Sequence, residues 1–301
     1  MRGQAFHWGR QTYLMGILNA TPDSFSGDGL VDSAALHPPT AESPAGGEAW
    51  LEAAIAQGRR MAAEGAHILD VGGESTRPGA QPVSVDEELR RVIPLIRGLV
   101  AAVDVPISID TSKAAVAAAA LAAGASLVND VWGLRLDPPI AQVAAQHGAP
   151  VILMHNRSQR QHVSIDPALG GRYVGAAYSE LLGDIAAELQ ISIDLARGAG
   201  IPDAHIILDP GIGFGKTVAQ NLELLDRLGE LRSLGFPLLV GSSRKSFIGY
   251  TLDLPPEQRI EGTAATVAIA IARGADLVRV HDVQAMARVA RMADAIVRRA
   301  P

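Results

Sequence analysis

Polar side chains directly follow several short apolar runs of the chain. Three of them, Asp110, Asn129 and Asp209, are two carboxylates and an amide. A carboxylate can accept two neighbouring N–H groups at once, such as the exocyclic amine and ring N–H of an aminopyrimidinone. Lys245 can donate to a ring carbonyl. We therefore expect these four residues to bind a flat heterocycle rich in N–H donors.

A second group of residues after apolar runs is suited to anions. Arg77, Arg279 and His281 are cationic donors that suit a phosphate or diphosphate. Asn19 offers a neutral oxygen, a kind of ligand that Mg²⁺ accepts beside phosphate oxygens. The pattern predicts a diphosphate subsite, with Mg²⁺, next to the heterocycle.

Each of these residues also has a structural interpretation. Asp110 and Asp209 can cap helices, Asn129 can brace a turn, Lys245 can neutralise an aspartate, and His281 can lie at the surface. Met154 either lines the pocket or packs in the core. The functional interpretations are not independent, because all of these residues would belong to one shared site.

The tripeptide 215–217, Gly-Lys-Thr, resembles the end of a phosphate-binding P-loop. The full motif requires a glycine five residues before Gly215, where this chain has Pro210. The glycines at 211 and 213 also lack the third glycine of a dinucleotide-binding fingerprint. Nucleoside triphosphate and dinucleotide sites are therefore not expected here.

The elements that position these residues are short strands alternating with alanine-rich helices. Continuous apolar strands between helices are typical of a parallel sheet covered on both faces. The predicted strands are 13–19, 67–73, 106–110, 127–130, 151–155, 206–209, 238–241 and 277–282. Eight units in 301 residues predict an α/β fold, a (β/α)8 TIM barrel, as a single domain over 1–301. Its active site lies at the carboxyl ends of the strands.

Local signals support this arrangement. Glycines at 65, 124, 148, 200, 235 and 274 precede strands and indicate helix ends. Ser84 and Glu87 form the pattern of a capping box. Two long polar loops, about 20–47 and 156–171, follow strands, and we expect them at the catalytic face. Gly72, Gly73 and Gly79 predict that the loop after the second predicted strand, 74–79, is mobile; we call it the second loop. Residues 1–12 are placed to cover the opposite mouth of the barrel.

The composition excludes several classes of protein. Hydrophobic residues make up 48% of the chain, which is enough for a large core, and no run reaches membrane-spanning length. The net charge of −6 and the lack of a basic run argue against nucleic-acid binding. The chain has no cysteine and no signal-peptide pattern. We expect a cytoplasmic protein with neither nucleic-acid nor membrane partners.

At this point the motifs resemble those of one family along nearly the whole chain. The sequence is similar to the dihydropteroate synthases, folate-pathway enzymes that join 4-aminobenzoate to a 6-hydroxymethyl-dihydropterin diphosphate and release pyrophosphate. The resemblance lies in residues 15–26, 70–79, 108–113, 129–130, 209–216, 241–246 and 279–283. These motifs occur in the family's order.

The resemblance implies roles for the residues above. By the family's pattern, Asp110, Asn129, Asp209 and Lys245 hold the pterin, and Asn19, Arg77, Arg279 and His281 hold the diphosphate with Mg²⁺. Thr76, Pro78, Phe214 and Ser246 shape the aminobenzoate pocket. Asp110, Arg77, Lys245, Arg279 and His281 would act in catalysis, and Met154 would contact substrate.

Two other functions stay open at this stage: a corrinoid-linked pterin-binding methyltransferase, and a paralogue that binds pterin without turnover. The methyltransferase has no need of the Ser-Thr-Arg-Pro and Ser-Arg-Lys-Ser motifs at 75–78 and 243–246. The segment 262–272 is small or apolar on nearly all sides, which is typical of a helix buried all round. Burial of this segment against a second subunit predicts a homodimer, and the resemblance implies the same, because members of the family are commonly dimers.

Overall fold

The computed structural model describes residues 4–21, 47–77, 79–159 and 162–298. All eight predicted strands are present and form one parallel sheet in the order β8-β5-β4-β3-β2-β1-β10-β9. A bridge between Leu208 and Leu238 closes this sheet into a barrel. The strands are β1 (Tyr13–Asn19), β2 (Ile68–Gly72), β3 (Ile107–Asp110), β4 (Leu127–Asp130), β5 (Val151–Met154), β8 (Ile206–Asp209), β9 (Leu239–Val240) and β10 (Leu277–Val280).

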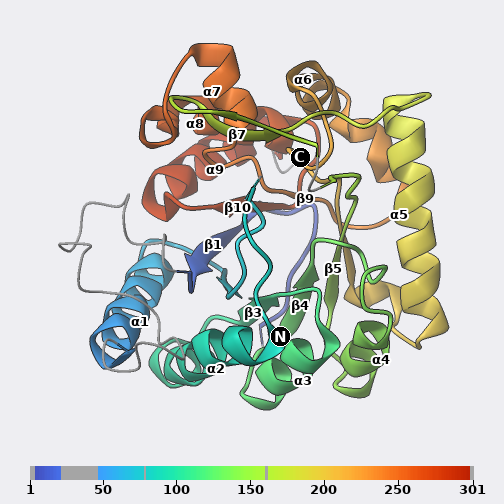
Figure 1. The fold of residues 1–301 in the computed structure, drawn as a ribbon. Coiled ribbons are helices and arrows are strands. Elements are labelled where there is room, and N and C mark those ends of the chain that lie inside the picture. Colours follow the sequence, from blue (N-terminus) through green and yellow to red (C-terminus); the bar gives the residue numbers. More distant parts are fainter. Residues whose placement is uncertain (1–3, 22–46, 78, 160–161, 299–301) are drawn as a thin grey trace.

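Helices surround the barrel on its outside (Figure 1). They are α1 (Gly47–Ala63), α2 (Val85–Ala102), α3 (Ala114–Ala122), α4 (Pro139–Gln146), α5 (Leu181–Gly198), α6 (Val218–Asp226), α7 (Ser246–Leu252), α8 (Ile260–Ala272) and α9 (Val283–Val297). Their apolar faces and the outer faces of the strands form the main core. The (β/α)8 prediction is therefore confirmed. None of the described helices is long and apolar enough to cross a membrane.

The ends of these helices follow the sequence signals. The glycines at 65, 124, 148, 200, 235 and 274 all have a positive φ, between 60° and 108°, which is easy for glycine and costly for other residues. The Ser84 side chain accepts a hydrogen bond from the Glu87 N–H and caps α2. The Glu87 carboxylate pairs with Arg90 and Arg91, so the described contacts show the serine half of the predicted capping box.

A separate apolar layer fills the inside of the barrel. It contains Tyr13, Met15, Ile68, Leu127, Ile152, Ile207, Leu239 and Leu277. Phe6 and Trp8 pack beneath it, with ring centroids 4.7 and 5.4 Å from the Tyr13 ring. The expectation that the N-terminal segment covers the lower mouth is confirmed for its described part.

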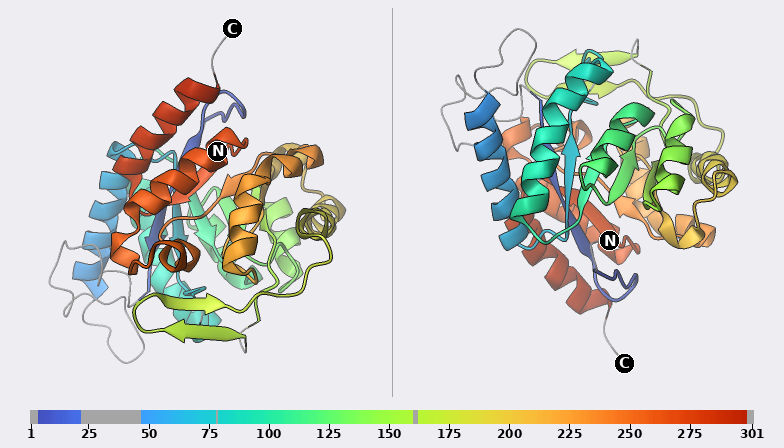
Figure 2. Two further views of the ribbon diagram at one scale, coloured as in Figure 1. Left: turned by 90° about the horizontal axis from the view of Figure 1, so that it is seen from above. Right: turned by 90° about the horizontal axis from the view of Figure 1, so that it is seen from below.

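A two-stranded antiparallel hairpin, β6 (Val163–Asp166) and β7 (Gly170–Tyr173), stands outside the barrel sheet. Figure 2 shows it at one end of the barrel, away from the end where α9 finishes. The sequence predicted only a polar loop here, so this part of the prediction was wrong. Both strands are short and half-exposed, and neither carries the apolar run that identifies the barrel strands.

Candidate active site

The polar residues of the site lie one layer above the apolar filling of the barrel. Side chains two positions apart on a strand point to the same face. Each strand therefore places its next inward residue above this apolar layer, nearer its carboxyl end. These residues are Asp70 after Ile68, Asn129 after Leu127, Met154 after Ile152, Asp209 after Ile207 and Arg279 after Leu277. Asp110 pairs in register with Asn129, and Met154 with Asp209.

Arg279 is the centre of this layer. Its Nε lies 2.6 Å from Asp70 Oδ2, and its terminal nitrogen lies 2.7 Å from Asp110 Oδ2. The Asn129 amide donates to the same Asp70 oxygen at 3.1 Å. One arginine thus compensates two carboxylates, of which Asp70 is fully buried.

The arrangement connects the two groups predicted from the sequence, the ring group and the phosphate group. Sequence reasoning assigned Arg279 only to the diphosphate, but the structure places it in direct contact with the predicted pterin ligand Asp110. It also adds Asp70, for which the sequence pattern predicted no role beyond its place in a motif. A carboxylate inside an otherwise apolar strand was the available signal, because buried charges are rarely found without a partner.

Burial raises the pKa of the Asp110 carboxyl to about 7, from an ordinary value of 3.8. The nearby Arg279 opposes this shift, whereas Asp70, Glu88 and Asp130 add to it. At neutral pH the carboxyl therefore holds its proton for part of the time. A bound cationic or N–H-rich group would favour its ionised form.

This raised pKa predicts how stability depends on pH. Between pH 3.8 and about 7 the folded protein keeps a proton that the unfolded chain has released, so this carboxyl's contribution to stability falls as pH rises. Asp110→Asn removes the titration. The melting temperature of the variant minus that of the wild type should therefore rise between about pH 4 and about pH 8. Thermal unfolding across this range measures the difference, and a flat or falling difference would contradict the prediction.

Asp209 and Lys245 lie close enough for each to shift the pKa of the other. The Asp209 carboxylate accepts the Gly211 N–H at 2.7 Å, and burial raises its pKa while Lys245 opposes the shift. The Lys245 ammonium donates to the Ile212 carbonyl and lies 4.5 Å from the centre of the Phe214 ring. Burial lowers the Lys245 pKa to about 8, although Asp209 and Asp110 raise it. Lys245 is therefore close enough to both predicted carboxylate ligands, Asp209 and Asp110, for their charges to shift its pKa.

One of the predicted phosphate ligands, His281, differs in charge from the expectation. His281 Nδ1 lies 3.0 Å from Ser243 Oγ, and burial together with nearby Arg244, Arg279 and Arg77 lowers its pKa to about 3. The imidazole is therefore uncharged and can serve as a neutral N–H donor. Arg77 is exposed on the second loop, close enough to His281 to influence its pKa.

The second loop is held more firmly than its glycines suggested. A side chain at Gly73 would collide with Val92 and Glu88, so this glycine serves close packing. The Lys113 ammonium binds Glu74 and Glu88 at 2.5 Å each, which fixes the start of the loop. Freedom of movement is therefore expected only nearer the tip, where Thr76 and Arg77 are exposed and Gly79 has a positive φ.

The residues predicted for the aminobenzoate pocket come from three loops. Phe214 stacks on Tyr173 of the hairpin, with ring centroids 6.3 Å apart, and the Tyr173 hydroxyl donates to the Thr76 carbonyl at 3.2 Å. Ser246 begins helix α7 next to Lys245. The hairpin thus links the second loop to the loop after β8. Pro78 and most of the long first loop, residues 22–46, lie outside the described residues.

Asn19 ends β1 beside Gly72. Among the described residues no group of three or more His, Cys, Asp or Glu side chains could enclose a metal ion. One amide oxygen fits Mg²⁺ that is bound mainly by phosphate oxygens, as is common for this ion. Met154 is buried but belongs to neither apolar cluster, which fits a position in the wall of the site.

Comparison with known proteins agrees with this geometry. Residues 15–281 match the family of pterin binding enzymes, so the fold and the site define a pterin-binding barrel. The dihydropteroate synthase of Synechocystis is 51% identical over 97% of this chain and 92% of its own length. The chain belongs to the dihydropteroate synthase family, whose members are transferases of folate synthesis.

Solved structures of the same family superpose on nearly all of the barrel. The dihydropteroate synthase of Clostridium difficile, crystallised in the presence of pteroic acid, is 45% identical with a TM-score of 0.83 and covers 98% of this chain and 100% of its own. The Xanthomonas albilineans enzyme in complex with 7,8-dihydropteroate is 38% identical with a TM-score of 0.79, over 98% and 97% of the two chains.

Proposed function

We propose that this chain joins 6-hydroxymethyl-7,8-dihydropterin diphosphate to 4-aminobenzoate, giving 7,8-dihydropteroate and pyrophosphate. The observation that carries the proposal is the polar layer inside the barrel: Asp70, Asp110, Asn129, Asp209 and Arg279 above a closed apolar base. Membership of the family supports the same reaction.

The reaction divides between the two ends of the pterin substrate. The bond between the methylene carbon and the diphosphate oxygen breaks, and a bond from that carbon to the arylamine nitrogen forms. Asp110 and Asp209 stabilise positive charge on the ring and the adjacent carbon, an electrostatic role. Arg77 and His281, from the second and last loops, donate to the departing pyrophosphate.

The arylamine is already neutral near pH 7, so its nitrogen can attack without a general base. Its proton leaves to solvent after the new bond has formed. Asn19 would hold Mg²⁺ together with the phosphate oxygens, and the ion would neutralise charge on the leaving group. We place the enzyme in the cytoplasm, which suits a chain without cysteine.

Incubation of the purified protein with both substrates and Mg²⁺ tests the function. Dihydropteroate and pyrophosphate should appear in equal amounts, and chelation of Mg²⁺ should slow their formation. Pterin binding without either product would identify a non-catalytic paralogue. Transfer of a methyl group from a methylated pterin to a corrinoid would identify the alternative enzyme class.

We also propose a homodimer formed through helices α8 and α9. The two neighbouring helices expose large apolar side chains: Ile269 on α8 is 47% exposed and Met292 on α9 is 63% exposed. Light scattering at micromolar concentration should give twice the chain mass. Ile269→Asp should shift it to a monomer, whereas Ile191→Asp on the exposed face of α5 should not. A monomeric wild type would contradict the proposal.

A further inference from the structure

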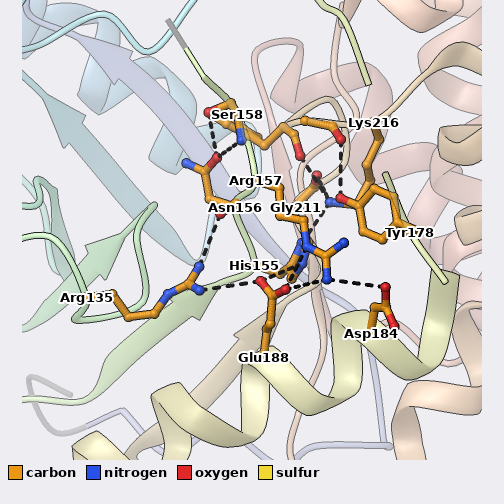
Figure 3. A network of polar contacts seen from close by, with 12 residues as sticks. Arg135, His155, Asn156, Arg157, Ser158, Tyr178, Asp184, Glu188, Gly211 and Lys216 are labelled. Carbon is orange, nitrogen blue, oxygen red and sulfur yellow. Dashed lines mark hydrogen bonds and ion pairs between the residues drawn. The ribbon is translucent and has the colours of Figure 1, made fainter. Parts of the chain in front are cut away.

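Lys216 has no role in the reaction described above, yet it is one of the most buried cations of the chain. Its side chain is 3% exposed, and its ammonium has three partners. It donates to the Gly211 carbonyl at 2.9 Å and to the Phe214 carbonyl at 3.2 Å, and it lies 3.0 Å from His155 Nδ1 (Figure 3). Three partners match the three N–H donors of a charged lysine.

These contacts determine the tautomer and the charge of the His155 ring. Because the ammonium donates to Nδ1, the ring proton must be on Nε2, and burial together with nearby Lys216, Arg135 and Arg157 lowers the His155 pKa to about 2. Nε2 lies 3.3 Å from Glu188 Oε2, which is within ion-pair distance but outside hydrogen-bond geometry. Glu188 of α5, itself held by Arg157 at 2.5 Å, thus faces the far side of a neutral imidazole (Figure 3).

The two carbonyls that Lys216 binds belong to the loop after β8. Gly211, Gly213 and Gly215 all have positive φ values, 71°, 83° and 66°, so the loop is built from residues with high conformational freedom. Only glycine fits at position 211, because a Cβ there would lie 1.9 Å from the His155 carbonyl oxygen. The same loop supplies the Gly211 N–H to Asp209 and the Phe214 ring beside Lys245.

We propose that Lys216 is a positioning residue that fixes the 211–214 loop, and through it Asp209 and Phe214, in the conformation that binds the pterin. The Glu188–His155 pair holds the ammonium in place from behind the loop. The inference rests on the proposed function only in naming the pterin as the ligand. Lys216 itself does not touch substrate.

The charge of Lys216 gives the proposal a signature in pH. Burial lowers its pKa to about 7; Asp209 and Glu188 raise it, whereas Lys245 and Arg157 lower it further. Above this pKa the amine loses an N–H donor and its free lone pair faces the acceptor nitrogen of His155. The Lys216 titration should therefore weaken pterin affinity as pH rises through about 7, opposing the gain from ionisation of Asp110 in the same range.

Glu188 separates this titration from that of Lys245. Removing Glu188 takes away an anion that raises the Lys216 pKa, so Glu188→Gln should move the weakening to lower pH. The charged groups that influence Lys245 are Asp209, Arg279 and Asp110, and Glu188 is not among them. Glu188 is also not among the groups that shift Asp110, the other carboxyl that titrates near pH 7. A shift in Glu188→Gln therefore reports on Lys216.

Lysine occurs only at positions 113, 216 and 245, which allows a direct measurement. In protein labelled with ¹³C at lysine Cε, each signal can be assigned from Lys113→Arg, Lys216→Met and Lys245→Arg. The Lys216 signal should titrate several units below that of an exposed lysine, and pterin binding should raise its midpoint. A Lys216 signal that titrates like an exposed lysine would contradict the burial that the proposal needs.

Pterin binding to Lys216→Met, measured by calorimetry, is the decisive experiment. Two lost hydrogen bonds predict an affinity about tenfold to a hundredfold weaker. Arg298→Met is the matched control, because it removes a cation with a 9% exposed side chain that binds Asp294 and the Ala275 carbonyl at the opposite end of the barrel. It should lower the melting temperature while leaving pterin affinity unchanged.

The outcomes distinguish this inference from the proposed function. Wild-type pterin affinity in Lys216→Met, or an unmoved pH dependence in Glu188→Gln, overturns the inference and leaves the function intact. A wild type that binds pterin but forms no dihydropteroate overturns the function, while the comparison of variants still decides the role of Lys216. A wild type that binds no pterin overturns both.

Discussion

Arg279→Met is expected to destabilise the protein and to abolish measurable pterin binding. The substitution keeps much of the side-chain volume but leaves Asp70 and Asp110 without their shared cation. Breaking a buried ion pair costs about 3–5 kcal/mol, and we expect the lower end because the guanidinium is 20% exposed. Without Arg279 the Asp110 pKa should rise further, so the carboxyl that should accept the ring's N–H groups becomes a donor at neutral pH.

A double variant separates the two effects. Adding Asp70→Asn to Arg279→Met removes one of the two opposing charges, so part of the lost stability should return. Diphosphate binding should not return, since the guanidinium is still missing. Denaturant unfolding measures the first quantity, and calorimetry with pyrophosphate and Mg²⁺ measures the second. An Arg279→Met protein that binds an uncharged pterin as tightly as the wild type would show that the arginine acts on phosphate alone.

Asp209→Asn should weaken pterin binding by about tenfold to a hundredfold, because a hydrogen bond to a charged acceptor contributes roughly 1.5–3 kcal/mol. The carboxylate has enough acceptor sites to bind the Gly211 N–H and still accept the ring donors, whereas the amide loses one oxygen. Since burial raises the Asp209 pKa, wild-type affinity should also begin to fall at a higher pH, on acidification, than it would for an ordinary aspartate.

The control for Asp209→Asn is Asp276→Asn. Asp276 is equally buried, at 4% exposure against 5%, but it accepts hydrogen bonds from Gly9 and Leu238 at the other end of the barrel. Its amide variant should lower stability without changing pterin affinity. Calorimetry on both variants decides the assignment, and equal losses of affinity would show that any buried aspartate has this effect.

The barrel itself could be predicted from the sequence because its signals are local. Apolar runs identify the strands, and positive-φ glycines mark the ends of the helices between them. Four of the residues predicted at strand ends, Asp110, Asn129, Asp209 and Arg279, lie together in the polar layer of the structure.

Pairings across the barrel could not be predicted in the same way. Arg279 and Asp110 are 169 positions apart, and their contact depends on how strands β3 and β10 face each other inside the closed sheet. The neutral state of His281 depends on its burial and on the nearby Arg244, Arg279 and Arg77. A local sequence pattern shows neither the burial nor these contacts. The hairpin was missed because its contacts with Thr76 and Phe214 are long-range, and its strands have no apolar run of their own.

The aromatic cluster of Phe6, Trp8 and Tyr13 determines the side from which molecules can enter and leave the site. Because this cluster closes the lower mouth and side chains fill the interior, substrates and products must share one opening, at the carboxyl ends of the strands. Under the proposed function the pterin binds at the polar layer, and the arylamine lies nearer the opening, beside Thr76 and Phe214. The pterin must therefore bind before the arylamine, and it cannot leave while the outer position is occupied. An arylamine mimic in the outer position would trap a bound pterin instead of displacing it.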